Sequence, residues 1–290
     1  MVHRLSWFRE HLGLNPGRIL DTQVCDVPLS RKVPGLFRHA GGALATAGQR
    51  PEETEAAKLS DLIEDMDRAR VTASLVVLHE DTEEFFRLAA QHPGRLFGLA
   101  YYDSLSPRRG LERVQALCSE HPAQILGVMT AMPRFGQDPR LRDFVPLYEY
   151  CGERSLPIQF CGGGDTTGEE ADRPMGLAVL ARTYPRLTVI CRYTGCWRGE
   201  TLTRLRRLPN LFLQVDGLSL QDLLRAVGGH KLLFGSDWHS REGRYFERVE
   251  AVRRLPWWQR QDVGWRTAVR VYGPRILSPS SQDHPQPSSR

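Results

Sequence analysis

Lysine is scarce in this chain, although the chain is basic overall. Only three of its 39 basic residues are lysine, and the formal net charge is +5. The arginines are spread through the whole sequence among aspartate and glutamate, whereas nucleic-acid-binding proteins usually gather basic residues into a stripe or tail. This distribution argues against a nucleic-acid partner. It indicates either a coding bias toward arginine or a preference for an anionic substrate.

Long apolar runs and paired cysteines are also missing. No apolar run approaches the roughly 20 residues that a membrane-spanning helix needs, and residues 1–15 lack the apolar core of a secretory signal. The six cysteines form no CxxC pair, and four of them fall in segments predicted to be buried. Free thiols of this kind are typical of a reducing compartment. We therefore expect a cytoplasmic protein without a membrane segment.

Short apolar segments alternate with amphipathic segments along the chain. The apolar ones are typical of parallel strands covered on both faces, and they are residues 18–25, 72–78, 96–102, 124–130, 156–161, 187–193, 211–216 and 231–237. The segments between them predict helices, and two more predicted helices follow the last strand, at residues 244–255 and 259–272. This alternation predicts a parallel α/β fold. Eight units without a glycine-rich phosphate loop after the first strand favour a (β/α)₈ TIM barrel over an open doubly wound sheet.

The predicted domain organisation is simple. Residues 1–277 form a single barrel domain, and the tail 278–290 has almost no apolar residues, so we expect it to be disordered. The exception to the regular alternation is the long segment 26–51, which is rich in proline and glycine. It follows the first strand, so it belongs at the end of the barrel where active-site loops lie. We interpret it as a lid or substrate-binding arm.

Several segments carry a resemblance to a known family. They include LIEDMDRARVTASLVV at residues 62–77, HPGRLFGLAYYD at 92–103, LYEYCGERSLPIQFC at 147–161, YPRLTVICRYTG at 184–195 and KLLFGSD at 231–237. In their order and spacing these segments resemble the amidohydrolase superfamily, in the branch that includes aromatic acid decarboxylases and lactonases. The resemblance runs from about residue 18 to residue 273, and it implies an amidohydrolase-like barrel.

The resemblance also implies a metal site, which this sequence has largely lost. The family binds a divalent metal through an HxH pair on strand 1, one histidine each on strands 5 and 6, and an aspartate on strand 8. Here the four histidine positions hold Gln23, Cys25, Cys161 and Tyr193, and only Asp237 is retained. An amide and a phenol are poor zinc ligands, so we expect no metal and no other cofactor. A rebuilt zinc site of Cys25, Cys161 and Asp237 is the alternative.

The candidate catalytic residues follow from the same strand ends. Asp237 ends strand 8, where an inward carboxylate acts as a general base toward water; the alternative is an inherited, hydrogen-bonded strand end. His239 lies two residues further on and is a second candidate. Tyr193 and Gln23 either donate hydrogen bonds to a carbonyl or oxyanion, or fill the space left by the lost ligands.

Four further residues are predicted to line the substrate site. Cys25 and Cys161 take histidine positions, and Cys161 is either an activated nucleophile or an inert buried thiol. His79 follows strand 2, where it touches substrate or is a solvated loop residue. Trp238 either forms a stacking wall or serves ordinary packing.

Arg192 is left undecided by the sequence. Simple alternation from Tyr193 points Arg192 toward the helices, where it needs an acidic partner. A local bulge would instead turn it into the barrel, where it would bind an anion.

The function that the residues and the resemblance together predict is metal-independent catalysis. We expect hydrolysis of a small polar carbonyl, lactone or amide substrate, anionic or aromatic in character, in a specialised biosynthetic pathway. Two alternatives stay open: a lyase reaction such as decarboxylation, elimination or cyclisation, and a non-catalytic binding protein on a retired enzyme fold. A homodimer is an expectation from the family resemblance alone.

Overall fold

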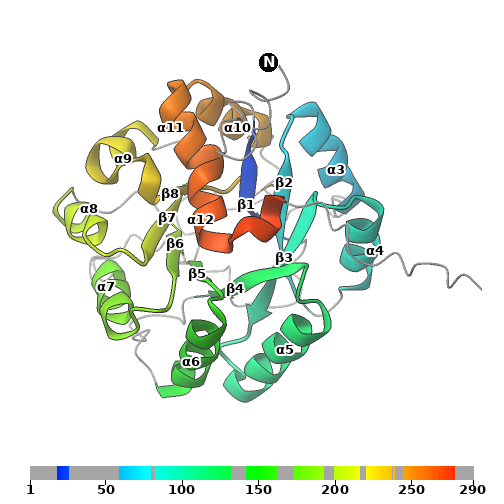
Figure 1. Ribbon diagram of the computed structural model, residues 1–290, viewed down its shortest axis with the longest axis vertical. Helices are drawn as coiled ribbons and strands as arrows, with labels where there is room; N and C mark the ends of the chain where they lie inside the picture. The colour runs from blue at the N-terminus through cyan, green and yellow to red at the C-terminus, as the bar shows by residue number, and fades with distance from the viewer. Residues whose placement is uncertain are drawn as a thin grey trace, which may run out of the picture.

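Eight parallel strands form one sheet whose order follows the sequence, with helices arranged around it (Figure 1). The structure is a computed structural model that describes residues 18–25, 59–79, 82–131, 142–161, 173–192, 199–215, 220–236, 238 and 244–277. The predicted (β/α)₈ barrel is therefore confirmed. The predicted lid at 26–51 and the predicted disordered tail at 278–290 lie outside the described residues, so both stay predictions.

All eight predicted strands are present, each within a few residues of its expected bounds. They are β1 Leu20–Cys25, β2 Ala73–Leu78, β3 Leu96–Tyr102, β4 Ile125–Ala131, β5 Ile158–Cys161, β6 Val189–Arg192, β7 Leu211–Val215 and β8 Leu232–Phe234. The main differences are at β6 and β8, where the described strand is shorter than the apolar segment in the sequence.

The helices between the strands also agree with the amphipathic segments. They are α3 Leu59–Arg68, α4 Glu83–Gln91, α5 Pro107–Glu120, α6 Val145–Arg154, α7 Arg173–Thr183, α8 Gly199–Arg206 and α9 Leu220–Val227. After β8 come α10 Tyr245–Arg253, α11 Trp257–Gln261, the π-helical turn η4 Asp262–Arg266 and α12 Thr267–Tyr272. Within the part of the chain that the structure describes, no helix has the length and apolar character needed to cross a bilayer.

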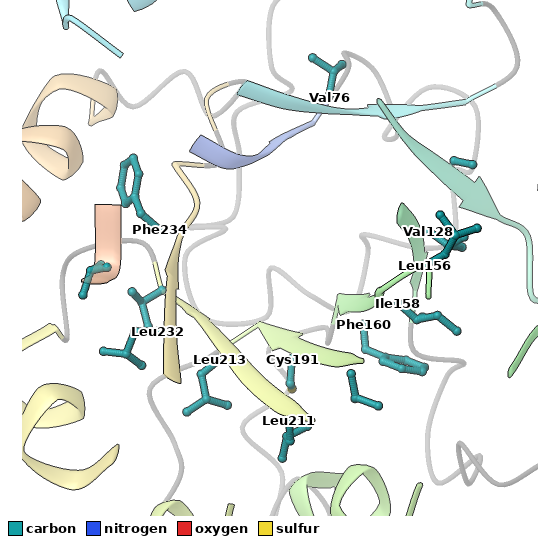
Figure 2. Packing of buried hydrophobic residues seen from close by; sticks show 14 of the residues in the cluster. Val76, Val128, Leu156, Ile158, Phe160, Cys191, Leu211, Leu213, Leu232 and Phe234 are labelled. Carbon is teal, nitrogen blue, oxygen red and sulfur yellow. The ribbon is translucent and has the colours of Figure 1, made fainter. Parts of the chain in front are cut away.

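Along β2, β3 and β5 to β8, alternate residues bury their side chains in two separate layers. On β5, Ile158 and Phe160 pack outward against the helices, and Figure 2 shows them pointing away from the barrel centre. On β6, Cys191 belongs to the same outer layer, whereas Ile190 belongs to the cluster that fills the barrel. Because a strand has a side-chain period of two, Arg192 shares the inward face with Ile190.

The C-terminal segment closes the barrel at the amino ends of the strands. Figure 1 shows α12 crossing the strands at this end. Trp265 and Tyr272 belong to the cluster inside the barrel, the Arg18 guanidinium lies 5.0 Å from the Trp265 ring centroid, and Thr267 Oγ1 donates to Gly229 O at 3.2 Å. Arg18 and Gly229 both precede strands. The opposite, carboxyl end is therefore left for the loops that carry function in this fold.

Side chains join the first and last strands. Asp21 is fully buried on β1, and its carboxylate accepts hydrogen bonds from the Ser236 backbone N–H at 2.8 Å and from the Ser236 hydroxyl. Thr22 Oγ1 donates to Phe234 O at 2.5 Å. The buried guanidinium of Arg248, on α10, donates to Ser236 O. These bonds fix the chain at Ser236, one residue before the carboxylate that the sequence analysis singles out.

Candidate active site at the carboxyl end of the barrel

Inward-pointing polar side chains lie at the carboxyl ends of two pairs of adjacent strands, β2 with β3 and β5 with β6. His79 follows β2, Tyr101 lies near the end of β3, and Cys161 and Arg192 end β5 and β6. Tyr101 and Cys161 both pack against the cluster that fills the barrel. We call this group of four residues the mouth cluster. Parallel strands bring their carboxyl ends to one face, so the four residues share the same end of the barrel.

Tyr101 and His79 form an aromatic pair at one side of the mouth. Their ring centroids are 4.4 Å apart, with the planes tilted by 47°. Burial, and then the nearby Asp103 and Cys161 side chains, raise the pKa of Tyr101 to about 12. The phenol is therefore protonated at neutral pH and acts as a hydrogen-bond donor. Tyr101 was not among the residues predicted from the sequence, although the alternation of Phe97, Leu99 and Tyr101 on β3 places it on the inward face.

Cys161 and Arg192 meet on the adjacent strands β5 and β6. Arg192 Nη1 donates to Cys161 Sγ at 3.8 Å, and both residues are partly exposed. The alternation argument from Tyr193, which turned Arg192 toward the helices, is therefore wrong. The register of β6 with both neighbouring strands is regular, so Arg192 points inward without the bulge that the second interpretation required. The mouth consequently contains a permanent positive charge.

A second group of polar side chains lies deeper in the barrel. Gln159 and Gln214 are 0% and 1% exposed, and Gln159 Nε2 donates to Gln214 Oε1 at 2.7 Å. From the closed end, the Tyr272 hydroxyl contacts Gln159 Oε1 at 3.4 Å. Among the described residues, Gln214 Nε2 has no hydrogen-bond partner although it is buried. Gly235 makes room for this amide, because a Cβ at residue 235 would lie 1.7 Å from Gln214 Nε2.

The predicted catalytic residues cannot be placed in the same detail. Asp237, Tyr193 and His239 lie outside the described residues. Gln23 and Cys25 are in β1, with a described backbone but undescribed side chains. Their proposed roles therefore stay predictions.

The backbone register of β1 adds one fact about two of these positions. The pairing of β1 with β2 shifts between Asp21 and Val24, and beyond the shift Cys25 is paired with Val77. Three residues on β1 thus span the same length as two on β2, so one extra residue is accommodated there as a bulge. This irregularity coincides with the stretch in which the family resemblance implies two metal ligands.

Trp238 contacts the outer layer of the barrel. Its indole N–H donates to Asp65 Oδ2 on α3 at 2.9 Å, and its ring packs against the cluster between strands and helices. These contacts tie Trp238 to α3. They agree with the packing interpretation of Trp238, and its role as a stacking wall for substrate stays a prediction.

The described donor set does not fit a divalent metal. No group of three or more histidine, cysteine, aspartate or glutamate residues comes together in the described ranges. Cys161, one of the three ligands in the alternative zinc site, has the Arg192 guanidinium 3.8 Å from its sulfur. A fixed cation at that distance repels a second cation, because like charges interact strongly where water is partly excluded. We therefore derive no chemical step through a metal.

Comparison with known sequences supports one family. The sequence model of the family described as amidohydrolase matches residues 31–273, which includes seven of the eight strands. No curated protein matches the chain significantly.

Comparison with solved structures supports the same fold. An uncharacterized TIM-barrel protein from Bordetella bronchiseptica superposes with a TM-score of 0.67 and 16% identity, covering 90% of this chain and 100% of that one. The 5-carboxyvanillate decarboxylase from Sphingomonas paucimobilis gives 0.63 and 15%, covering 88% and 99%. The 4-oxalomesaconate hydratase from Rhodopseudomonas palustris gives 0.64 and 15%, covering 89% and 96%. At these identities the likeness concerns the fold alone.

Proposed function

Because the chain belongs to the amidohydrolase family, we propose that it is a metal-independent enzyme that hydrolyses a small polar carbonyl, lactone or amide, with Asp237 as general base. The observation that carries this proposal is the mouth cluster, in which a thiol, a protonated phenol and a guanidinium from three strands share the catalytic face of the barrel. Asp237 follows Ser236, whose backbone and side chain are held by β1 and α10. An anchored strand end suits a base that must keep its orientation.

The proposed reaction uses water and the chain's own residues. Asp237 accepts a proton from water as the water oxygen bonds to the carbonyl carbon. The Arg192 guanidinium and the Tyr101 hydroxyl stabilise the oxyanion that develops. The bond from carbon to the leaving oxygen or nitrogen then breaks, and Asp237 returns the proton to that atom. The remaining candidates for orienting substrate are Gln23, Tyr193 and His239.

Decarboxylation is the second candidate reaction. It is supported by the inward Arg192, which suits a carboxylate substrate, and by the likeness of the fold to 5-carboxyvanillate decarboxylase. The two reactions differ in their products, since decarboxylation releases CO₂ and consumes no water. A non-catalytic binding role remains the alternative outside enzymes.

The test of this proposal is turnover by the Asp237→Asn variant. The purified protein is incubated with a panel of small lactones, amides and aromatic carboxylates, and products are followed by liquid chromatography and mass spectrometry, with CO₂ measured in parallel. Loss of a general base lowers the rate about 100-fold or more. Asp222→Asn, on the exposed face of α9, is the matched control and should retain full turnover.

Two results would reject the proposal. Turnover by Asp237→Asn at the wild-type rate would remove Asp237 from the mechanism. Absence of turnover across the whole panel, combined with tight binding of a panel member, would favour the non-catalytic role.

A further inference from the structure

Exposed aromatic side chains gather on the helices that follow the last strand. In the part of the chain that the structure describes, four large apolar side chains are exposed, and three of them lie on α10 and α11: Phe246, Trp257 and Trp258. The two tryptophans are 53% and 54% exposed, and their ring centroids are 6.2 Å apart. Large apolar rings gain free energy when they leave water, and tryptophan is enriched among the residues that dominate protein–protein contacts.

A groove lies next to these tryptophans on the outside of the barrel. It has a volume of about 550 Å³ and lies between the end of α3 and the outer face of α10, where apolar residues 69, 246, 249 and 251 line it together with arginine and glutamate. Arg260 of α11 donates from Nη1 to the carbonyl of Arg253 at 3.2 Å, so α11 adjoins the end of the groove that Arg253 lines. Figure 1 shows α3, α10 and α11 on the same side of the barrel. This surface therefore combines an exposed aromatic pair with a recess that has room for an aromatic side chain.

The charge on the exposed face of α10 changes sign along the helix. Glu247 and Glu250 lie in its first two turns, Arg253 is its last residue and Arg254 caps its C-terminal end. Glu250 and Arg254 form an exposed ion pair within the chain, with 3.6 Å between Oε1 and Nε. If a second copy of α10 packs antiparallel to the first, the acidic half of each helix lies beside the basic end of the other. The pattern of charges is thus complementary to itself across a two-fold axis.

Other kinds of partner fit this surface less well. A strongly acidic partner, or an anionic lipid surface, would be repelled by Glu247 and Glu250. A strongly basic partner would be repelled by Arg254 and Arg68, whose guanidinium carbon lies 5.0 Å from the Phe246 ring centroid at the groove. A second copy of this chain matches both halves of the pattern.

We propose that two copies of this chain form a two-fold dimer through α10 and α11, in which Trp257 and Trp258 of each copy enter the groove of the other. A two-fold contact uses the same patch on both copies, so each contact is made twice. The buried tryptophans contribute most of the affinity, and Glu247 beside the partner's Arg254 fixes the antiparallel orientation. The dimer does not depend on the proposed catalysis, because none of these residues belongs to the mouth cluster.

The molar mass of the full-length protein in solution tests the dimer. Size-exclusion chromatography with multi-angle light scattering, over a wide range of protein concentration, should give twice the 32.9 kDa of one chain. The variant with Trp257→Ser and Trp258→Ser should weaken the dimer about a hundredfold or more, because tryptophans that dominate the contact are lost from both copies. Leu105→Ser is the matched control. Leu105 is the fourth exposed apolar side chain, at 72%, and it precedes α5, so this variant should stay dimeric.

A charge-reversal experiment tests the antiparallel orientation. Glu247→Arg alone and Arg254→Glu alone should each weaken the dimer, because each sets like charges opposite one another across the two-fold axis. An equimolar mixture of the two variants should recover a dimer, since the mixed pair again sets opposite charges together on both sides of the axis. Native mass spectrometry distinguishes this heterodimer from either homodimer by mass. An effect confined to the fold of one chain would not be rescued by mixing.

Several outcomes would overturn the inference. They are a wild type with the mass of one chain at every concentration, a tryptophan variant that stays fully dimeric, and a mixture of the charge variants that forms no heterodimer. A monomeric wild type that sediments with phosphatidylglycerol vesicles, but not with phosphatidylcholine vesicles, would assign the patch to a membrane surface instead. If circular dichroism shows that the tryptophan variant is misfolded, the exposed charge variants decide alone.

Discussion

Replacing Gly235 by alanine perturbs the polar layer below the mouth directly. The new Cβ would lie 1.7 Å from Gln214 Nε2, 2.6 Å from its Cδ and 2.9 Å from its Cγ. The whole outer half of the Gln214 side chain must therefore move, although it is buried and bonded to Gln159. Overpacking of a core typically costs about 1–3 kcal/mol, and a lost buried hydrogen bond adds about 1 kcal/mol. We expect Gly235→Ala to lower the free energy of unfolding by about 2–4 kcal/mol.

Urea denaturation followed by tryptophan fluorescence and circular dichroism measures this cost. The matched control is Gly152→Ala on α6, where a Cβ meets nothing within 4 Å. Alanine is about 1 kcal/mol better than glycine inside a helix, so this control should be neutral or slightly stabilising. The double variant Gly235→Ala with Gln214→Ala should cost clearly less than the sum of the single variants, since the collision partner is gone. A cost below about 0.5 kcal/mol, or strict additivity, would refute the packing argument.

Two further predictions concern other buried polar groups. Asp21→Asn should lower the free energy of unfolding by about 1.5–3 kcal/mol, since the buried carboxylate accepts two hydrogen bonds from Ser236; an unchanged urea midpoint would contradict the role given to this pair. Burial and then the charge of Arg270 lower the pKa of Lys231 from 10.5 to about 8. The unfolded chain therefore binds more protons than the folded chain between about pH 8 and 10.5, so this group adds stability as the pH rises through that window. The free energy of unfolding of the wild type, measured relative to Lys231→Met, should therefore increase from pH 7 to pH 10. A difference between the two proteins that does not change with pH would show that Lys231 keeps an ordinary pKa.

The barrel itself could be predicted from the sequence because its signal is repeated eight times. Each strand is a short, nearly continuous apolar segment, and each helix has one apolar face, so small errors at element ends do not change the fold. The elements whose bounds moved most are β6 and β8, where the apolar segment continues beyond the described strand. The hydrophobic periodicity of a sequence predicts which residues are buried. It predicts less well the residue at which the hydrogen bonding of a strand ends.

The candidate site could be predicted only in part, for a specific reason. The family resemblance predicts which strand ends carry functional residues. The direction of each side chain, however, depends on which residues of a short strand face the barrel interior and which face the helices. Shifting this alternation by one residue turns every side chain to the other face. This is why the sequence left the direction of Arg192 undecided, whereas Ile190 in the barrel interior places Arg192 on the inward face. The same alternation on β3 would have identified Tyr101.

Contacts between distant segments were beyond the sequence. Gln159 and Gln214 are 55 residues apart, and Asp21 and Ser236 are 215 residues apart. A single sequence contains no local pattern that predicts such pairs, since each of these residues is simply one polar residue within an apolar strand. Only the folded barrel, in which β8 lies next to β1, gives these residues their partners.

The metal content of the protein tests the central claim most directly, namely that the enzyme works without a metal at the mouth. Protein purified without chelator would be analysed by inductively coupled plasma mass spectrometry. We predict less than about a tenth of an equivalent of zinc, iron or manganese in the wild type, since true metal sites hold stoichiometric metal. About one equivalent of any of these metals in the wild type would contradict the account.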